Sequence, residues 1–264
     1  RISPELHLKR LIIGGYNKIF EIGRIFRNEG IDREHLQDYT QMEMYWAYTD
    51  YTQMMELARK LVLHAVHETL GGYTHEFQGQ TIDWSKPWKQ IDYFEVFTEY
   101  TGLDLAMATE SELGSYAERE GIDTGKHCGR GRLIDTIFKK KARPHLIEPG
   151  FLVLPPVDIE PLAKRWMEDQ NRVERFQVVA CGSELGKGFS ELNDPVDQRV
   201  RFKEQARLRE AGDKEAQMMD EDFVEALEYG MPPTAGFAYS ERLFAFLMGR
   251  PVRETVFSPL MKPR

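Results

Sequence analysis

The feature that most constrains the fold is a pair of segments that read as two strands joined by a polar loop. Residues 20–30 and 40–48 alternate apolar side chains with charged or aromatic ones. In a strand every second side chain points to the same face. Arg27 and Glu29 therefore share a face with Glu21, and Glu43 shares a face of the second strand with Gln41 and Tyr45. The pattern predicts a hairpin that carries charge on one side.

The polar groups of this hairpin suit a ligand with a carboxylate or phosphate at one end and a cation elsewhere, because arginine binds oxyanions and carboxylates bind cations. We expect Tyr45 and a ring of apolar side chains to surround that ligand. The apolar residues are Phe20, Phe26, Met44 and Trp46. The alternative is a sheet face held by surface salt bridges, without a ligand.

Length and charge set broad limits. A chain of 264 residues, of which 41% are hydrophobic, can bury one large core or two small ones, and we expect one main domain over residues 1–264. The formal net charge of -8 argues against a surface that grips nucleic acid everywhere. A local basic stripe remains compatible with RNA binding.

Cysteine use and the chain ends suggest the cellular setting. Cys128 and Cys181 form no CxxC pair, and no signal-like or membrane-length apolar run occurs, so we expect a cytoplasmic protein without membrane contact. His64 and His67 lack a third ligand nearby, which favours a partly exposed pair over a metal site. The chain opens at Arg1 in what reads as the middle of an element, and we expect a fragment.

Local patterns predict the remaining elements. Ser3 and Pro4 are typical of a helix start, and Asp50 with Gln53 predicts a capping box. The apolar runs at 150–156 and 176–181 predict two central strands. Further expected elements are a hairpin within 73–92, helices at 93–100, 109–120, 133–141, 194–212, 221–230 and 240–247, and a strand at 235–239.

Candidate chemical groups recur in three sets, while the common phosphate-loop, dinucleotide-binding and serine-hydrolase motifs are absent. Arg242 falls in the first turn of a predicted helix, where it opposes the helix dipole and suits a bound phosphate. The sets are the arginines Arg27 and Arg242, the carboxylates Glu5, Glu29, Glu43, Glu184 and Glu191, and the aromatics Tyr39, Tyr45 and Phe189. Clustered arginines with carboxylate-held metal indicate phosphoryl chemistry without a protein nucleophile.

Two of these segments resemble signature motifs of the class II aminoacyl-tRNA synthetases. Residues 27–30 (RNEG) with 42–45 (MEMY) resemble motif 2, and residues 236–242 with 253–254 resemble motif 3. The segments that resemble lysyl-tRNA synthetases in particular are 3–6 (SPEL), 161–164 (PLAK), 188–194 (GFSELND) and 230–236 (GMPPTAG). The resemblance covers nearly the whole chain and implies an α+β fold, an antiparallel sheet flanked by helices.

The resemblance also implies an ATP site, with Arg27 and Arg242 as the catalytic residues. Arg27 would hold the α-phosphate and the lysine carboxylate, and Arg242 would hold the γ-phosphate. The other implied ATP contacts are Glu29 at the adenine end, Tyr39 stacked on adenine, Arg33 and His35 at the outer phosphates, and Glu184 through a metal ion.

A lysine site is implied by the same resemblance. Glu5 would bind the α-amino group, with Glu43 beside it. Tyr45 and Glu191 would receive the ε-ammonium, and Phe189 would line the aliphatic stem. A buried ammonium requires a carboxylate partner, so Glu191 would select against uncharged amino acids.

Three positions depart from the family pattern. Gln177 stands where the family has a glutamate for divalent metal, so a Mg²⁺ site of Gln177 and Glu184 would carry less charge. Lys187 replaces an asparagine near the substrate carboxylate, where it would pair with that carboxylate or repel an ammonium. The strand of motif 3 is one residue shorter, with Ala238, Tyr239 and Ser240 at usual glycine positions.

The predicted function is that of a lysine-tRNA ligase catalytic domain that uses ATP, lysine and tRNA(Lys). A homodimer is expected through motif 1, which would precede Arg1 together with the anticodon-binding domain. One alternative is a ligase that lysylates elongation factor P; residues 161–164 and 232–234 favour the tRNA enzyme. The other is a non-catalytic lysine-binding regulator, which would not require the phosphate-binding set of Arg27, Glu184 and Arg242.

Overall fold

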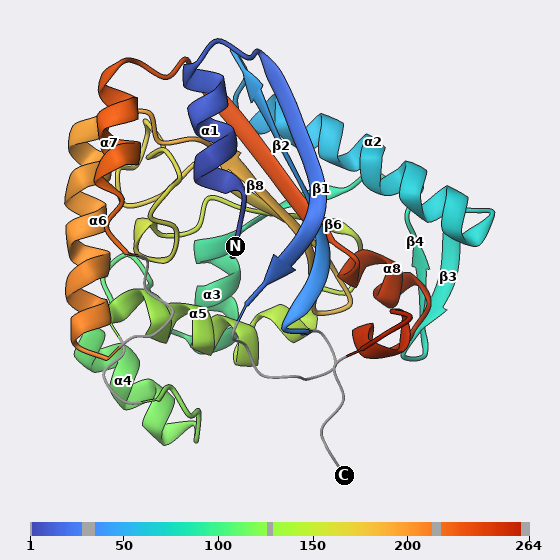
Figure 1. The fold of residues 1–264 in the computed structure, drawn as a ribbon. Helices are drawn as coiled ribbons and strands as arrows, with labels where there is room; N and C mark the ends of the chain where they lie inside the picture. The colour runs from blue at the N-terminus through green and yellow to red at the C-terminus, as the bar shows by residue number, and fades with distance from the viewer. Residues whose placement is uncertain (1, 28–34, 126–128, 213–217, 260–264) are drawn as a thin grey trace.

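One large sheet organises the protein in the computed structural model, which describes residues 2–27, 35–125, 129–212 and 218–259. Helices cover both faces of this sheet (Figure 1). Its strands lie in the order β1-β2-β9-β8-β7-β6-β5. They are β1 (Lys18–Phe26), β2 (Asp38–Ala47), β5 (Lys89–Asp92), β6 (Gly150–Val153), β7 (Arg175–Ala180), β8 (Ser183–Ser190) and β9 (Thr234–Ser240). The predicted α+β class is confirmed.

The sheet is mixed rather than wholly antiparallel. Five neighbouring pairs are antiparallel, as predicted, whereas β5 and β6 are parallel. The physical reason is the connection between these two strands, since parallel neighbours require a long crossover. That crossover contains α3 (Tyr93–Thr101), α4 (Glu110–Arg119) and α5 (Arg130–Lys141). The strands β6 and β7 are interior and fully buried, as their apolar runs predicted.

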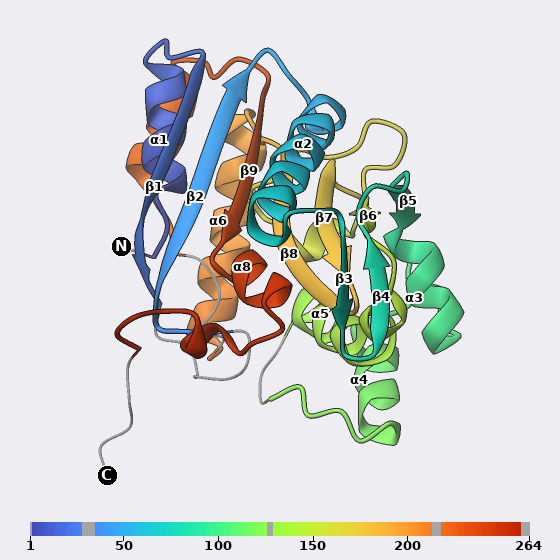
Figure 2. The same ribbon diagram turned by 90° about the vertical axis from the view of Figure 1, so that its right-hand side faces the viewer.

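One face of the sheet is covered by α2 (Tyr51–Leu70), which lies across β8 and β9 in Figure 2. The predicted capping box of Asp50 and Gln53 begins this helix, and left-handed Gly71 (φ 70°) ends it. The hairpin of β3 (Thr74–Phe77) and β4 (Gln80–Asp83) and the short helix α8 (Arg242–Leu247) complete the layer. Its core includes Met54, Val62, Trp84, Phe176 and Phe237.

The other face carries two groups of helices, visible in Figure 1. At one end α1 (Glu5–Ile13), α6 (Pro195–Glu210) and α7 (Glu221–Glu228) share a hydrophobic core with β2 and β8. At the other end α3, α4 and α5 pack on β6 and β7. The 3₁₀ turns are η1 (Arg143–His145), η2 (Val157–Ile159) and η3 (Val252–Glu254). The polar residues predicted to bind ligands lie between these two cores.

The apolar ring expected around the ligand was wrong. Phe20 and Phe26 are 69% and 55% exposed on the edge strand β1, and Met44 and Trp46 pack into the core beneath α2. Because side chains alternate along a strand, these even-numbered residues point to the face opposite Glu43. All four side chains therefore lie on the α2 side of the sheet, where Met44 and Trp46 pack on the core and Phe20 and Phe26 are exposed beside it.

Candidate functional site

Strand register brings the predicted residues into two rows across β2, β9, β8 and β7. Residues directly opposite one another on neighbouring antiparallel strands share a face of the sheet. One row consists of Glu43, Ala238, Lys187 and Gln177, and the next consists of Tyr45, Gly236, Phe189 and Arg175. The predicted lysine-binding and metal-binding side chains in these rows thus come from three strands, β2, β8 and β7, onto one face.

Gly236 keeps space open within the second row. A Cβ at this position would lie 2.6 Å from Cε1 of Tyr45 and would also collide with the carboxylate of Glu191. Real Cβ contacts are not this short, so any side chain here would displace its neighbours. The small residue is required because Tyr45 and Glu191 approach each other over the strand.

Glu43 is held by three hydrogen bonds. Ser3 Oγ donates to Oε1 at 2.9 Å and Gln41 Nε2 donates to the same atom at 2.5 Å, while the Tyr45 hydroxyl donates to Oε2 at 3.0 Å. Burial raises the pKa of Glu43, and the nearby Glu5 raises it further, against these hydrogen bonds. The contact from Ser3 joins the start of α1 to the sheet and places Glu43 near Glu5, as predicted.

Lys9 occupies the centre of the predicted lysine site, which the sequence analysis did not anticipate. Its Nζ contacts Glu5 Oε1 at 2.7 Å and also contacts Glu191 Oε2, and the residue is 1% exposed. The ammonium lies 5.3 Å from the centroid of the Phe189 ring and 6.0 Å from that of Tyr45. The one available signal was the four-residue spacing from Glu5, which puts both side chains on one helix face.

The charges of Lys9 and Glu191 are coupled. Burial would lower the pKa of Lys9, but attraction to Glu191 and Glu5 outweighs it and raises that pKa. Burial raises the pKa of Glu191 well above its usual range, and Lys9 acts in the opposite direction. Lys9 is therefore a protonated cation whose contact favours the ionised form of Glu191.

Lys187 contacts a second carboxylate that the sequence analysis missed. Its Nζ donates to Glu160 Oε2 at 2.9 Å, and Arg175 Nε lies 3.4 Å from the same oxygen. Glu160 is only 5% exposed. Burial would raise its pKa, but Lys187 and Arg175 outweigh burial and lower it. Arg175 was detectable from the two-residue spacing to Gln177, whereas Glu160 lies in an irregular segment without a pattern.

The two predicted metal ligands lie together. Gln177 Nε2 donates to Glu184 Oε2 at 2.5 Å, across the β7-β8 hairpin. Burial would raise the pKa of Glu184, but Arg175, Lys187 and Arg242 lower it overall, so the carboxylate is ionised. No cluster of three or more His, Cys, Asp or Glu side chains suited to a metal occurs in the described ranges.

Arg242 and Arg27, the two predicted phosphate-binding residues, each donate a hydrogen bond to a main-chain oxygen. Arg242 Nη1 donates to the main-chain oxygen of Glu184 at 3.3 Å. Arg242 is the first residue of α8, and Glu241 is its N-cap. Ser240 is the last residue of β9, and its Oγ accepts a hydrogen bond from the Arg242 N–H at 3.3 Å. Arg27 Nε donates to the oxygen of Ile2 at 3.0 Å, and its guanidinium carbon lies 5.7 Å from the Tyr39 ring centroid.

The loop between β1 and β2 carries three of the predicted ATP contacts, of which the structure describes His35. Glu29 and Arg33, which were predicted at the adenine and the outer phosphates, fall outside the described residues. His35 is half-buried, and its role at the phosphates stays a prediction.

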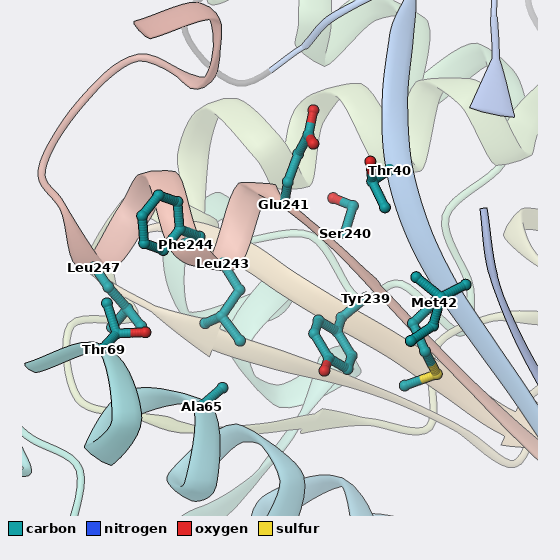
Figure 3. Close-up of a pocket in the computed structure, with 11 residues that line it drawn as sticks. Thr40, Met42, Ala65, Thr69, Tyr239, Ser240, Glu241, Leu243, Phe244 and Leu247 are labelled. Atoms are coloured by element: carbon teal, nitrogen blue, oxygen red, sulfur yellow. The ribbon is translucent and has the colours of Figure 1, made fainter. Parts of the chain in front are cut away.

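A separate hollow of about 200 Å³ lies on the opposite face, between the sheet, α2 and α8. Figure 3 shows Met42, Tyr239 and Leu243 pointing into it from β2, β9 and α8. Its lining is mainly apolar and includes none of the predicted ATP or lysine residues. The candidate site is therefore distinct from this hollow.

Comparison with known proteins agrees with the geometry. Residues 1–262 match the family described as tRNA synthetases class II (D, K and N). The chain is 45% identical over 266 residues to a lysine-tRNA ligase of Thermotoga maritima. This alignment covers 100% of the chain and 53% of that protein. For a lysine-tRNA ligase of Moorella thermoacetica, the identity is 43% over 267 residues, covering 100% of the chain and 55% of that protein.

The chain spans about half the length of the curated relatives that it matches. Across the ranges that the structure describes, no helix is both long and apolar enough to cross a membrane. The family match extends over nearly every residue, and the identities hold across the whole chain. The chain therefore belongs to the class II tRNA synthetases of the D, K and N group.

Proposed function

We propose that the protein is a lysine-tRNA ligase, and that this chain carries its catalytic site. The observation that supports this most directly is the set of carboxylates and aromatic rings around the buried ammonium of Lys9. Glu5 and Glu191 contact that ammonium, and Tyr45 and Phe189 present their rings to it. A site with this composition suits the side chain of lysine.

The proposed reaction has two steps. A carboxylate oxygen of lysine attacks the α-phosphorus of ATP, which forms lysyl-adenylate and releases pyrophosphate. A hydroxyl of the terminal ribose of tRNA(Lys) then attacks the lysyl carbonyl carbon, which forms the ester and releases AMP. Arg27 would stabilise charge on the α-phosphate and Arg242 would hold the γ-phosphate, as preorganised cations do in phosphoryl transfer.

Magnesium bound with ATP fits the donor set of Glu184 and Gln177. The carboxylate of Glu184 is ionised beside three cations, and Gln177 adds a neutral amide next to it. Two protein ligands leave most of the Mg²⁺ shell to water and phosphate oxygens, which is usual for this ion. When bound, Mg²⁺ would neutralise charge on the phosphates. A homodimer, tRNA(Lys) as partner and a cytoplasmic location belong to the same proposal.

Pyrophosphate exchange and tRNA charging test the proposal. We expect the intact protein to exchange labelled pyrophosphate into ATP when lysine is present and to attach lysine to tRNA(Lys). Exchange without charging, together with lysylation of elongation factor P, would identify the protein-modifying ligase instead. Lysine binding without exchange would identify a regulator and contradict the proposal.

A further inference from the structure

The ammonium site already contains a cation that belongs to the protein. Lys9 Nζ contacts Glu191 through Oε2 and Glu5 through Oε1. Glu191 is 1% exposed, and neither of its carboxylate oxygens accepts a regular hydrogen bond from the part of the chain that the structure describes, although Oε2 is in ion-pair contact with Lys9 Nζ. The Oε1 atom packs against Gly236, closer than a Cβ at that position would allow, so the absence of a side chain at Gly236 makes room for the carboxylate itself. One oxygen of Glu191 is thus in contact with Lys9, while the other is buried and contacts no cation among the described residues.

The charge balance favours a Lys9 that stays in place when substrate binds. Glu5, Glu43 and Glu191 supply three carboxylates, and Lys9 neutralises one of them. When all three carboxylates are ionised, two negative charges remain, which matches the α-amino and ε-ammonium groups of a lysine whose carboxylate is held by Arg27. Glu160 does not alter this balance, because it is already paired with Lys187 and Arg175.

We propose that Lys9 is a positioning residue for lysine selection, which holds the Glu191 carboxylate through Oε2 and leaves Oε1 for the substrate ε-ammonium. The inference rests on the proposed function, because it requires lysine as the ligand. Lys9 would act through Glu191 and would not touch the reacting atoms. It would determine specificity by keeping Glu191 charged, since a neutral carboxyl loses most of its preference for a cation.

The surroundings of Glu191 explain why Lys9 is needed. Glu5 from α1 and Glu160 from the segment after η2 both act on Glu191 as like charges. Tyr45 and Glu43 approach from β2, and the Lys187 ammonium is directed to Glu160. Among the described residues, Lys9 is the cation in direct contact with Glu191. Without it, desolvation and neighbouring carboxylates would both favour protonation.

The test compares Lys9→Met and Lys9→Arg with a control, Lys60→Met, on the exposed side of α2. Lysine-dependent pyrophosphate exchange is measured from about pH 6 to about pH 9, the range in which a strongly raised carboxyl pKa becomes visible. For Lys9→Met we expect the KM for lysine to rise about tenfold or more near neutral pH, one pKa unit being worth a factor of ten. This KM should fall again as pH rises, because Glu191 then loses its proton.

The variants are expected to differ in defined ways. Lys9→Arg keeps the positive charge, so its KM for lysine should not fall in this way as pH rises. Lys60→Met should match the unaltered protein. The kcat at saturating lysine should change less than the KM in Lys9→Met. A Lys9→Met protein with normal KM and an unchanged pH profile would overturn the proposal. Tighter lysine binding would also overturn it, because Lys9 would then be a competitor of the substrate.

A second measurement does not depend on activity or on the folding of a variant. The side-chain carboxyl carbon of Glu191 is titrated by NMR in the unaltered, ligand-free protein. Burial favours the protonated form of Glu191, and the proposal requires that Lys9 outweighs burial, so we expect an ionised carboxylate at neutral pH; a protonated carboxyl there would contradict the role of Lys9. If the unaltered protein shows no lysine-dependent exchange, the proposed function fails, whereas this titration still reports on the Lys9 and Glu191 pair.

Discussion

The guanidinium of Arg242 donates a hydrogen bond of 3.3 Å to the main-chain oxygen of Glu184, which joins the start of α8 to strand β8. The two residues lie 58 positions apart in the sequence. Their side chains also interact electrostatically, since Arg242 lowers the pKa of Glu184. The cation assigned to the γ-phosphate therefore lies next to the carboxylate assigned to the metal, as an ATP site requires.

Removal of either phosphate-binding arginine should reduce lysine activation. We expect Arg242→Ala and Arg27→Ala each to lower lysine-dependent pyrophosphate exchange by roughly two orders of magnitude or more, about 3 kcal/mol in the activation barrier. Arg119→Ala, which removes an exposed arginine of α4, serves as the control. Circular dichroism would verify that each variant folds. Near-normal exchange by a folded Arg242 or Arg27 variant would refute the assignment of that residue.

The magnesium requirement should respond to the charge at position 177. Gln177→Glu adds a carboxylate beside Glu184, and we expect it to lower the magnesium concentration that gives half-maximal exchange. The measurement is a magnesium titration at fixed ATP and lysine. Gln90→Glu places the same change on the exposed side of β5 and should leave the curve unaltered. An identical curve for Gln177→Glu would show that this residue does not contact the metal.

Amino-acid choice should depend on the charge of Glu191. We expect Glu191→Gln to abolish most lysine activation, because breaking a buried ion pair costs about 3 to 5 kcal/mol. Activation of norleucine, which ends in a methyl group, should fall much less, since norleucine never uses the Glu191 carboxylate. Activation of both amino acids is measured for the variant and for the control Glu56→Gln on α2. Equal fractional losses for the two substrates would mean that Glu191 acts on ATP, metal or folding.

Space at Gly236 should be essential for the lysine site. Gly236→Ala would push a methyl group into Tyr45 and the Glu191 carboxylate, and overpacking of this kind costs about 1–3 kcal/mol. We expect the KM for lysine to rise about tenfold or more, given that 1.4 kcal/mol is a factor of ten. Gly114→Ala on α4 meets nothing within 4 Å and should stabilise the fold slightly. Unchanged lysine activation by Gly236→Ala would show that ligand binds elsewhere.

Several elements were predictable because their causes are local. The capping box of Asp50 and Gln53 satisfies hydrogen-bond donors within one turn of α2, so neighbouring residues contain the whole signal. The apolar runs of β6 and β7 identified interior strands for the same reason. The antiparallel expectation failed only at β5, where pairing direction depends on a crossover of three helices and not on the strand itself.

In the candidate site too, contacts within one strand were predictable from the sequence, and contacts between separate elements were not. Residues of one strand, such as Glu43 and Tyr45, were assigned to one face from their spacing, and the structure confirms that shared face. The apolar ring was misplaced because its members are even-numbered residues, whose side chains lie on the face of the sheet opposite Glu43 and Tyr45. Lys9 and Glu160 were missed because their partners lie on other elements, and local periodicity carries no information about such contacts.

Local patterns and motifs were enough to assign the class of fold, the family, most strand and helix segments and most of the residue types that the chemistry requires, although the central strand β8 was not predicted. These follow from hydrogen bonding and side-chain periodicity over a few residues, and from motifs that keep their order along the chain. Which charges meet depends on the tertiary fold. It set Lys9 between Glu5 and Glu191 and directed Lys187 to Glu160, because the distance between charges on separate elements is fixed by packing alone.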